Sequence, residues 1–236
     1  MSFLYWPTCT LNPRETPANL VPFTRGGGKV LNGMERATRT DKGSWVVELQ
    51  GISIGGLDYG KKRTWNALRV GLGGRAGLIV VPVRSWDTAP YASGKFERKI
   101  MLPHDDGTPF DDGTLYSQGA IDIVMEETAT ISANIVTLRR VQAADNLAGI
   151  RFSYQHALYE TGPAIDVDGD LWTLPIFPSI RATIPAGAPL ECDEPTCLVH
   201  LADDRGMDIA QGKRERQEVS VAFVEAVDYW NDLAGA

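Results

Sequence analysis

The sequence lacks the features that define membrane, disulfide-rich and nucleic-acid-binding proteins. Its longest apolar run, Leu78 to Val83, is far shorter than the ~20 residues of a membrane-spanning helix. The opening MSFLYWPTCTLNP has no basic segment ahead of an apolar one, and three cysteines in 236 residues make no disulfide framework. A net charge of −7 argues against a surface that neutralises phosphates. We therefore expect a protein that stays soluble in a cytoplasm, with no membrane insertion.

Catalytic motifs are also missing. The three histidines lie far apart and none stands in an H-E-x-x-H pattern, and there is no G-x-S-x-G elbow. The segment from Arg25 to Lys29, RGGGK, lacks the spacing of a phosphate-binding loop. Cys9, Cys192 and Cys197 are interpreted as buried or incidental thiols, because CDEPTC supplies only two thiolates to a zinc ion. The sequence therefore predicts a protein that is not an enzyme and carries no cofactor and no metal.

Two acidic stretches invite a comparison with calcium sites. An EF-hand loop counted from Asp166 needs glycine at position 6 and glutamate at position 12, but Gly169 comes fourth and Phe177 twelfth. Asp-Gly between apolar runs instead predicts a hairpin turn. The second stretch, His104 to Gly113, offers four aspartates, and it is either a solvated loop or a site for a divalent cation.

The first patterned elements are a strand, a helix and a second strand. Apolar residues alternate from Ser44 to Ile54, which indicates a half-buried strand. A helix follows, with Asp58 as its cap and Gly73 and Gly74 as its stop. The run Leu78 to Val83 is apolar throughout, as in a buried strand.

The remainder of the chain is predicted to be mainly β-structure. A long irregular segment, 86–118, contains one short strand near 98–102, and alternation at 128–136 predicts a further strand. Short strand candidates then follow at 149–154, 158–162, 171–178, 196–202 and 218–227, and 228–236 is a tail or a short helical turn.

These patterns predict a mainly β fold of barrel or sandwich type with one α-helix and long loops or arms. We divide the chain into an extended N-terminal arm, the first half of a β-barrel with the helix, an acidic loop, a second β unit, and a C-terminal strand with a tail. The corresponding ranges are 1–43, 44–103, 104–118, 119–202 and 203–236.

Some aromatic and basic residues fall outside the patterned elements. Three tryptophans lie in the arm, the long loop and the tail, where they serve either an interface or local packing. Three arginines of the arm contact an acidic neighbour or remain solvated. These candidate interface residues are Trp6, Arg25, Arg36, Arg39, Trp86 and Trp230.

Two stretches resemble distal tail and related tail-tip hub proteins of long-tailed bacteriophages and gene transfer agents. RTWNALRVGLGGRAGLIVVPV, Arg63 to Val83, preceded by a strand from Trp45, is similar to their helix, Gly-Arg turn and buried strand. A second signature comprises Gly-x-x-Phe-Ser, Pro-x-Ile-Arg, an Ala-Gly turn and a Pro-led strand ending in Leu. Its positions here are Gly149, Phe152, Ser153, Pro178, Ile180, Arg181, Ala186, Gly187, Pro195 and Leu201. VSVAFVEAV is similar to the glutamate-ended strand that follows in these proteins.

The resemblance implies a split β-barrel of the tail-tube or hub type, assembled as a closed ring, commonly a hexamer. Such a ring lies at the virion tail tip and joins the tail tube protein to the baseplate, the tail-tip hub or receptor-binding proteins, with DNA passing through its lumen. It is a structural protein assembled in the host cytoplasm. Two rivals remain: a carbohydrate-binding β-sandwich module of a tail tip or host-recognition device, and a cell-wall hydrolase with paired carboxylates.

Overall fold

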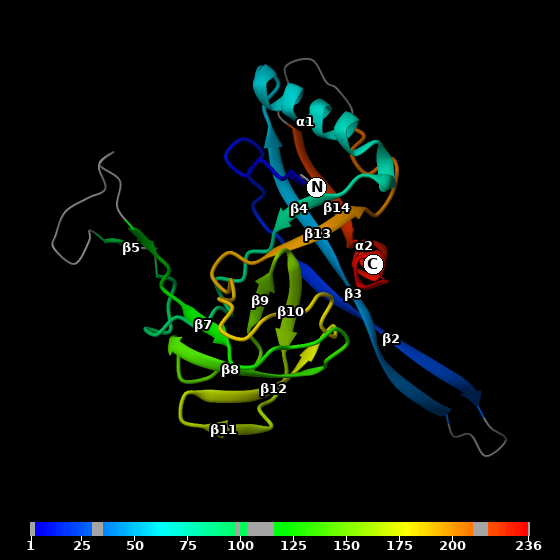
Figure 1. Ribbon diagram of the computed structural model, residues 1–236. Helices are drawn as coiled ribbons and strands as arrows, with labels where there is room; N and C mark the ends of the chain where they lie inside the picture. The colour runs from blue at the N-terminus through cyan, green and yellow to red at the C-terminus, as the bar shows by residue number, and fades with distance from the viewer. Residues whose placement is uncertain (1–2, 30–34, 98–99, 103–115, 210–216, 236) are drawn as a thin grey trace.

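The computed structural model describes residues 3–29, 35–97, 100–102, 116–209 and 217–235, and it is a mainly β structure, as predicted (Figure 1). The first sheet curls into a half-barrel with the strand order β1-β4-β13-β14-β3-β2. β1 pairs with β4 in parallel, and the other neighbours are antiparallel. Its strands are Leu4–Tyr5 (β1), Ala18–Lys29 (β2), Glu35–Ile54 (β3), Ile79–Pro82 (β4), Thr196–Leu201 (β13) and Gln217–Glu225 (β14).

The second sheet has the order β7-β8-β12-β10-β9, with β11 also paired to β12, and a separate hairpin joins β5 to β6. Two α-helices and a short 3-10 turn, η1, complete the described structure. The ranges are Ile100–Leu102 (β5), Tyr116–Gln118 (β6), Asp122–Met125 (β7), Ile135–Gln142 (β8), Arg151–Tyr154 (β9), Ala157–Thr161 (β10), Asp166–Asp168 (β11), Leu171–Phe177 (β12), Tyr59–Leu72 (α1), Gly74–Ala76 (η1) and Val227–Gly235 (α2).

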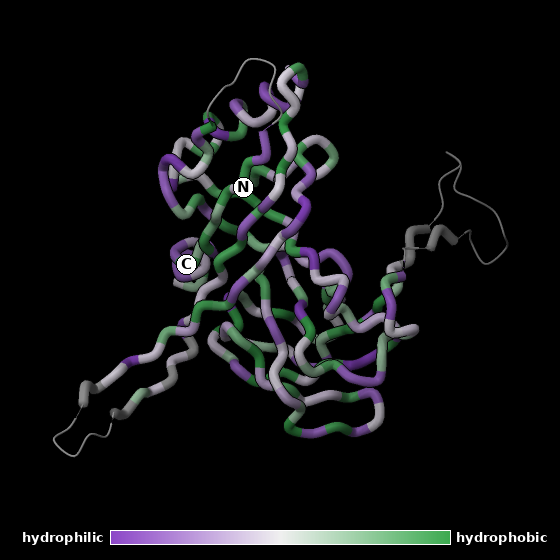
Figure 2. Tube along the Cα trace, turned by 180° about the vertical axis from the view of Figure 1, so that it is seen from behind, coloured by the Kyte–Doolittle hydropathy of each residue, from purple (hydrophilic) through white to green (hydrophobic). Residues whose placement is uncertain are grey.

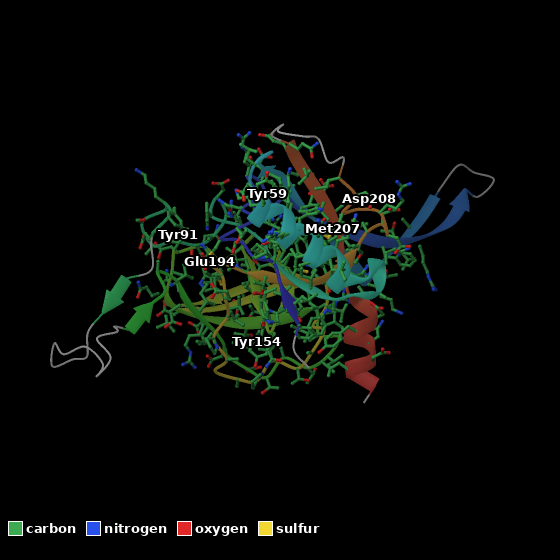
Figure 3. The ribbon with its side chains drawn as sticks, turned by 90° about the horizontal axis from the view of Figure 1, so that it is seen from above. Tyr59, Tyr91, Tyr154, Glu194, Met207 and Asp208 are labelled. Atoms are coloured by element: carbon green, nitrogen blue, oxygen red, sulfur yellow. The ribbon has the colours of Figure 1, made fainter. Side chains whose placement is uncertain are left out.

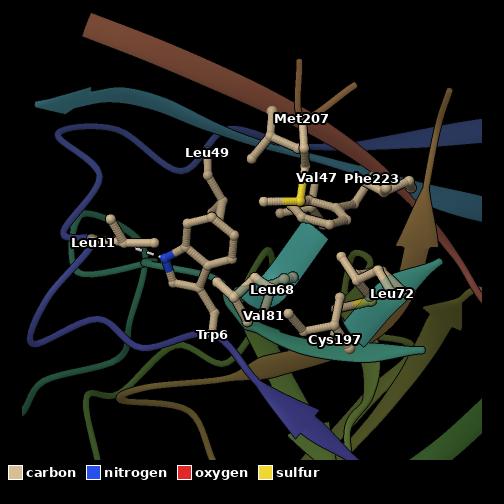
Figure 4. Close-up of a cluster of buried hydrophobic side chains, with 14 of the residues drawn as sticks. Trp6, Leu11, Val47, Leu49, Leu68, Leu72, Val81, Cys197, Met207 and Phe223 are labelled. Carbon is tan, nitrogen blue, oxygen red and sulfur yellow. Dashed lines mark hydrogen bonds between the residues drawn. The ribbon is translucent and has the colours of Figure 1, made fainter. Parts of the chain in front are cut away.

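Helix α1 begins and ends at the residues that the sequence indicated. The Asp58 carboxylate accepts a hydrogen bond from the backbone N–H of Lys61 at 3.0 Å, which satisfies one of the free donors of the first turn. Gly73 ends the helix at φ 58°, a left-handed conformation that glycine adopts without a Cβ clash. The buried face of α1 contributes Leu68 and Leu72 to the core of the first sheet (Figure 4).

Central strands of the first sheet serve two cores. Successive residues of a strand point to opposite faces. Val81 and Cys197 therefore pack beneath α1, whereas their neighbours Val80 and Leu198 pack against the second sheet. The two sheets thus belong to one continuous body, whose apolar stretches run along its strands (Figure 2). This arrangement places β13 in the first sheet, although the sequence division assigned residues 119–202 to a second unit.

The N-terminal region also differs from the predicted arm over 1–43. Its first part belongs to the body, because β1 pairs with β4 and Leu11 is fully buried. The β2–β3 hairpin, by contrast, projects from the body (Figure 1). At the other end of the chain, residues 227–235 form the helix α2, where the sequence left a tail or a short helical turn open.

The strand predicted over 128–136 was wrong for most of its length. β8 begins at Ile135, and the preceding residues form a loop in which Ser132 has φ 68°. Ala129 and Ser132 donate backbone hydrogen bonds to the carbonyls of Ile184 and Ile180 at 2.9 and 2.8 Å, so this loop pairs with another loop. By contrast, the predicted hairpin is confirmed, with Gly169 at φ 60° between β11 and β12.

Candidate assembly surfaces

The first candidate surface is the part of the β2–β3 hairpin that precedes Ser44. It comprises residues 18–29 and 35–43 and is called the arm from here on. β2 lies at the edge of the first sheet and offers its outer backbone groups for pairing. Two apolar side chains of β2 are exposed, Val21 at 46% and Phe23 at 51%. Phe23 and Arg25 stand at alternate positions of one strand, so they share a face, and Arg25 is also exposed. This face combines an aromatic ring with a cation.

The arm is basic within an acidic chain. Residues 18–43 contain five Lys or Arg and two Asp or Glu, whereas the whole chain carries a net charge of −7. Of the predicted interface arginines, Arg25 lies on β2, and Arg36 and Arg39 lie on β3, where Arg39 pairs with Thr24. The side chains of Arg36 and Arg39 fall outside the described part of the structure.

A buried ion pair fixes the root of the arm. Arg181 follows β12 and donates from Nε to the Glu225 Oε1 at 2.8 Å and from Nη2 to Oε2 at 3.1 Å. The Arg181 side chain is 9% exposed and that of Glu225 is 1% exposed. Two parallel N–H···O bonds are the strongest form of this interaction, because they fix distance and orientation together.

Both members of the pair also hold the backbone of β3. The Nη2 of Arg181 donates to the Gly43 carbonyl at 2.6 Å, and the Glu225 Oε2 accepts from the backbone N–H of Trp45 at 3.1 Å. Trp45 in turn donates from its indole to the Leu158 carbonyl at 2.8 Å. The arm therefore leaves the body from a strand segment anchored to both sheets.

Gly43 is required by close packing at this root. A Cβ at Gly43 would lie 2.2 Å from the Phe177 ring and 2.9 Å from the Val21 carbonyl oxygen. Both distances are shorter than van der Waals contact, so the backbone of the arm approaches β12 as closely as it can.

The second candidate surface is a groove of about 300 Å³ next to Trp86, lined in part by β1 and β4, at the edge of the first sheet remote from β2. Tyr5 and Trp86 contribute its aromatic walls, and Thr8, Arg84 and Glu194 contribute polar groups. Figure 3 shows Glu194 near Tyr91, away from the projecting ends of β2 and β3.

Trp86 forms an exposed aromatic cluster with Phe96. It is 42% exposed and its ring centroid lies 5.2 Å from that of Phe96, which is 50% exposed. The guanidinium of Arg84 lies 5.2 Å from the Trp86 ring centroid, within the range of a cation–π contact. Arg84 is itself held by a hydrogen bond to the Pro13 carbonyl at 2.8 Å and by another to Asn12. Trp86, for which the sequence left an interface and local packing open, is thus partly exposed and contacts Phe96 and Arg84.

An acidic turn borders the groove. Glu191 accepts hydrogen bonds from the backbone N–H groups of Asp193 and Glu194 at 3.1 and 2.9 Å, which fixes the turn. Tyr91 donates its hydroxyl to the buried carboxylate of Asp193. Burial and then this carboxylate raise the pKa of Tyr91 above its ordinary value, because the phenolate would be both desolvated and repelled. Glu191 and Glu194 remain exposed to solvent.

Two of the predicted interface tryptophans lie inside the protein. Trp6 is 4% exposed, donates its indole N–H to the Leu11 carbonyl at 2.8 Å, and meets the Trp65 ring edge-on at 6.2 Å (Figure 4). Trp230 is also 4% exposed and packs in the core of the second sheet. Local packing, the alternative that the sequence left open, accounts for both, because each ring buries its surface within its own chain.

The histidines of the described chain have structural partners. Nδ1 of His156 lies 2.9 Å from the Thr196 hydroxyl oxygen, and Nε2 lies 3.1 Å from the Tyr5 hydroxyl oxygen. Nδ1 of His200 lies 2.9 Å from the Leu201 carbonyl. Burial lowers the pKa of His156, because the imidazolium loses hydration there. Sequence reasoning missed the Tyr5–His156 contact, since nothing local joins residues so far apart.

Within the described ranges, no three His, Cys, Asp or Glu side chains come together in a way that suits a metal ion. The acidic stretch His104 to Gly113 lies outside those ranges. Cys192 and Cys197 are buried free thiols, as interpreted from the sequence, whereas Cys9 is exposed. Neither α1 nor α2, the two described α-helices, combines the length and the apolar character that crossing a bilayer requires.

Comparison with models of known families and with curated proteins finds no match to this chain. The two surfaces and the sequence resemblance are therefore the features that bear on function.

Proposed function

We propose that this protein is a structural component of a phage-like virion: a distal tail protein that assembles into a ring, commonly of six copies. The ring joins the tail tube to the tail-tip or baseplate hub and to receptor-binding proteins. Its role is to connect and not to catalyse, and it works at the tail tip.

The arm with its fixed root is the observation that carries this proposal. A ring forms when two different surfaces of one chain meet head to tail and the rotation closes. The arm offers one such surface, with an open strand edge and the exposed side chains of Val21 and Phe23. Because Arg181 and Glu225 bind β3 at its root, the arm keeps one direction relative to the body. A fixed direction is what a closed ring of defined copy number requires.

Both residues of the root pair also stand in the stretches that resemble tail proteins. Arg181 ends the Pro-x-Ile-Arg motif, and Glu225 is the glutamate of VSVAFVEAV. The 2.8 Å hydrogen bond between them explains why one motif ends in arginine and the other contains glutamate. A buried arginine needs a carboxylate, and a buried carboxylate needs a cation.

The negative charge of the chain supports the passage of DNA through the ring. A lumen without excess Lys and Arg does not hold phosphates by counterion release, so the genome slides through it. A lumen lined mostly by Lys and Arg would contradict this part of the proposal.

Electron microscopy of the purified protein tests the proposal. We expect closed rings of about six subunits, with the symmetry counted from class averages. Isolated particles of one subunit at every protein concentration would contradict it.

A further inference from the structure

We propose that the groove beside Trp86 receives the Phe23–Arg25 face of the arm from a second copy of this chain. The inference rests on the proposed ring and names the two surfaces that meet in it.

The groove and the arm lie at opposite edges of the first sheet. Tyr5 of β1 and Val80 of β4 line the groove, whereas β2 forms the other edge. In Figure 3, Tyr91 and Glu194 lie away from the projecting ends of β2 and β3. The Arg181–Glu225 pair anchors the arm at its root, so the arm does not fold back onto its own groove. Two surfaces at opposite edges of one sheet suit a head-to-tail contact, in which each copy gives its arm to one neighbour and receives the arm of the other.

The arm and the rim of the groove carry opposite charges. The arm carries five basic and two acidic residues over 18–43. Beside the groove, the turn from Glu191 to Glu194 contains three carboxylates in four residues, and Glu191 and Glu194 are exposed. Arg25 of the incoming arm therefore meets the carboxylate of Glu194 in the groove wall, with Glu191 on the same turn. Complementary charges of this kind speed association and fix the register of two surfaces.

The arm and the groove also present exposed aromatic rings to solvent. Phe23 is 51% exposed on the arm, and Trp86 is 42% exposed in the groove wall. A groove of about 300 Å³ equals roughly ten water molecules at ~30 Å³ each, which is enough for a phenylalanine ring. Aromatic residues at the centre of a contact, with charges around them, are the usual anatomy of a protein interface.

Charge reversal tests whether the arm of one copy contacts the groove of another. Reversing both partners should restore what each single reversal weakens. We compare the wild type with Arg25→Glu, Glu194→Arg and the double variant that carries both changes. Arg63→Glu on the exposed face of α1 is the control for charge reversal elsewhere. The readout is the protein concentration at which half of the chains are in rings, from light scattering. Far-ultraviolet circular dichroism and thermal unfolding check that each variant folds.

We expect each single reversal to raise that concentration roughly tenfold or more, because like charges then face each other. The double variant restores assembly, since its glutamate on the arm meets an arginine at the groove. An equimolar mixture of the two single variants also forms rings, with the copies alternating. Arg63→Glu assembles as the wild type does.

Other outcomes separate the inference from the proposed function. Rings that persist unchanged in both single variants overturn the arm–groove contact and leave the ring itself standing. A wild-type protein that forms no rings contradicts both. In a second experiment, the wild type and Trp86→Ala are each titrated with an N-acetylglucosamine trimer. Saturable binding that Trp86→Ala abolishes, with rings intact, overturns the inference in favour of a saccharide site.

Discussion

Arg181 and Glu225 stand 44 residues apart in the chain and meet at 2.8 Å as a buried, bidentate ion pair. Each partner also holds one backbone group of β3, at Gly43 and Trp45. The pair therefore connects the loop after β12, the end of β14 and the root of the arm. Removing either charge leaves the other buried without its partner, and the arm loses its anchor.

Arg181→Met is the first variant to examine. We expect it to lower the free energy of unfolding by about 3–5 kcal/mol, because it leaves the Glu225 carboxylate buried and unpaired. Urea denaturation followed by tryptophan fluorescence measures the change. Replacing both partners, Arg181→Met with Glu225→Leu, should cost less than the single change, since no lone charge then remains.

An exposed ion pair supplies the control. The side chains of Arg14 and Glu218 are 67% and 49% exposed and pair at 3.3 Å. Solvent and salt screen such a pair, so Arg14→Ala should cost under about 1 kcal/mol. If Arg181→Met costs no more than Arg14→Ala, the Arg181–Glu225 pair does not have the structural role assigned to it.

Gly43→Ala tests the close approach at the root of the arm. The new Cβ would meet the Phe177 ring at 2.2 Å, so we expect a loss of about 1–3 kcal/mol from overpacking, together with weaker assembly. Gly60→Ala is the matched control, because its Cβ would have its nearest contact at 3.5 Å and alanine favours a helix. A Gly43→Ala protein as stable as the wild type would show that Phe177 moves aside freely.

Thiol reactivity tests the two cores. Burial raises the pKa of Cys192 and of Cys197, so neither forms the reactive thiolate in the folded protein. A chromogenic disulfide reagent should therefore label Cys9 alone in the native protein and all three cysteines in urea. Cys9→Ser should remove the native signal. Rapid labelling of two or three thiols without denaturant would contradict the burial of Cys192 or Cys197.

His156 predicts a pH dependence of stability. Its folded pKa lies below its ordinary value of ~6.5, so the unfolded chain takes up the proton first as the pH falls. His156 contributes fully to the free energy of unfolding above about pH 6.5. This contribution is lost as the pH falls from about 6.5 through the pKa of His156 in the folded protein. His156→Asn removes the titrating group and tolerates the positive φ of this turn.

The measurement is the difference in unfolding free energy between wild type and His156→Asn, from about pH 7.5 down to about pH 5.5. We expect the advantage of the wild type to shrink as the pH falls. A difference that stays constant or grows toward acid would show that His156 is not held neutral by burial.

The sequence was sufficient to predict the ends of helix α1, because these depend on neighbouring residues alone. Asp58 and Gly73 mark the ends of α1 because capping involves neighbours within one turn. Alternation failed between residues 128 and 134, where the apolar residues of a loop also alternate. There, Ser132 bonds to the Ile180 carbonyl, a partner that no local pattern indicates.

The surfaces depended on long-range contacts and were harder to predict. Trp6 stands in an unpatterned segment, so its burial against Trp65 and Phe223 was not visible. Arg181 and Glu225 each belong to a motif noted in the sequence. Their contact was not predicted, because it depends on how the loop after β12 packs against β14 of the other sheet. Trp86, by contrast, was placed in a long loop and is exposed there, since loops lie at the surface.

The native mass of the wild-type protein in solution, determined by light scattering over a range of concentrations, shows whether the chain assembles into a ring. We expect a stable species of about six 25.8 kDa chains that appears as closed rings in micrographs of the same sample. A single 25.8 kDa species at every concentration, with no rings, would contradict it.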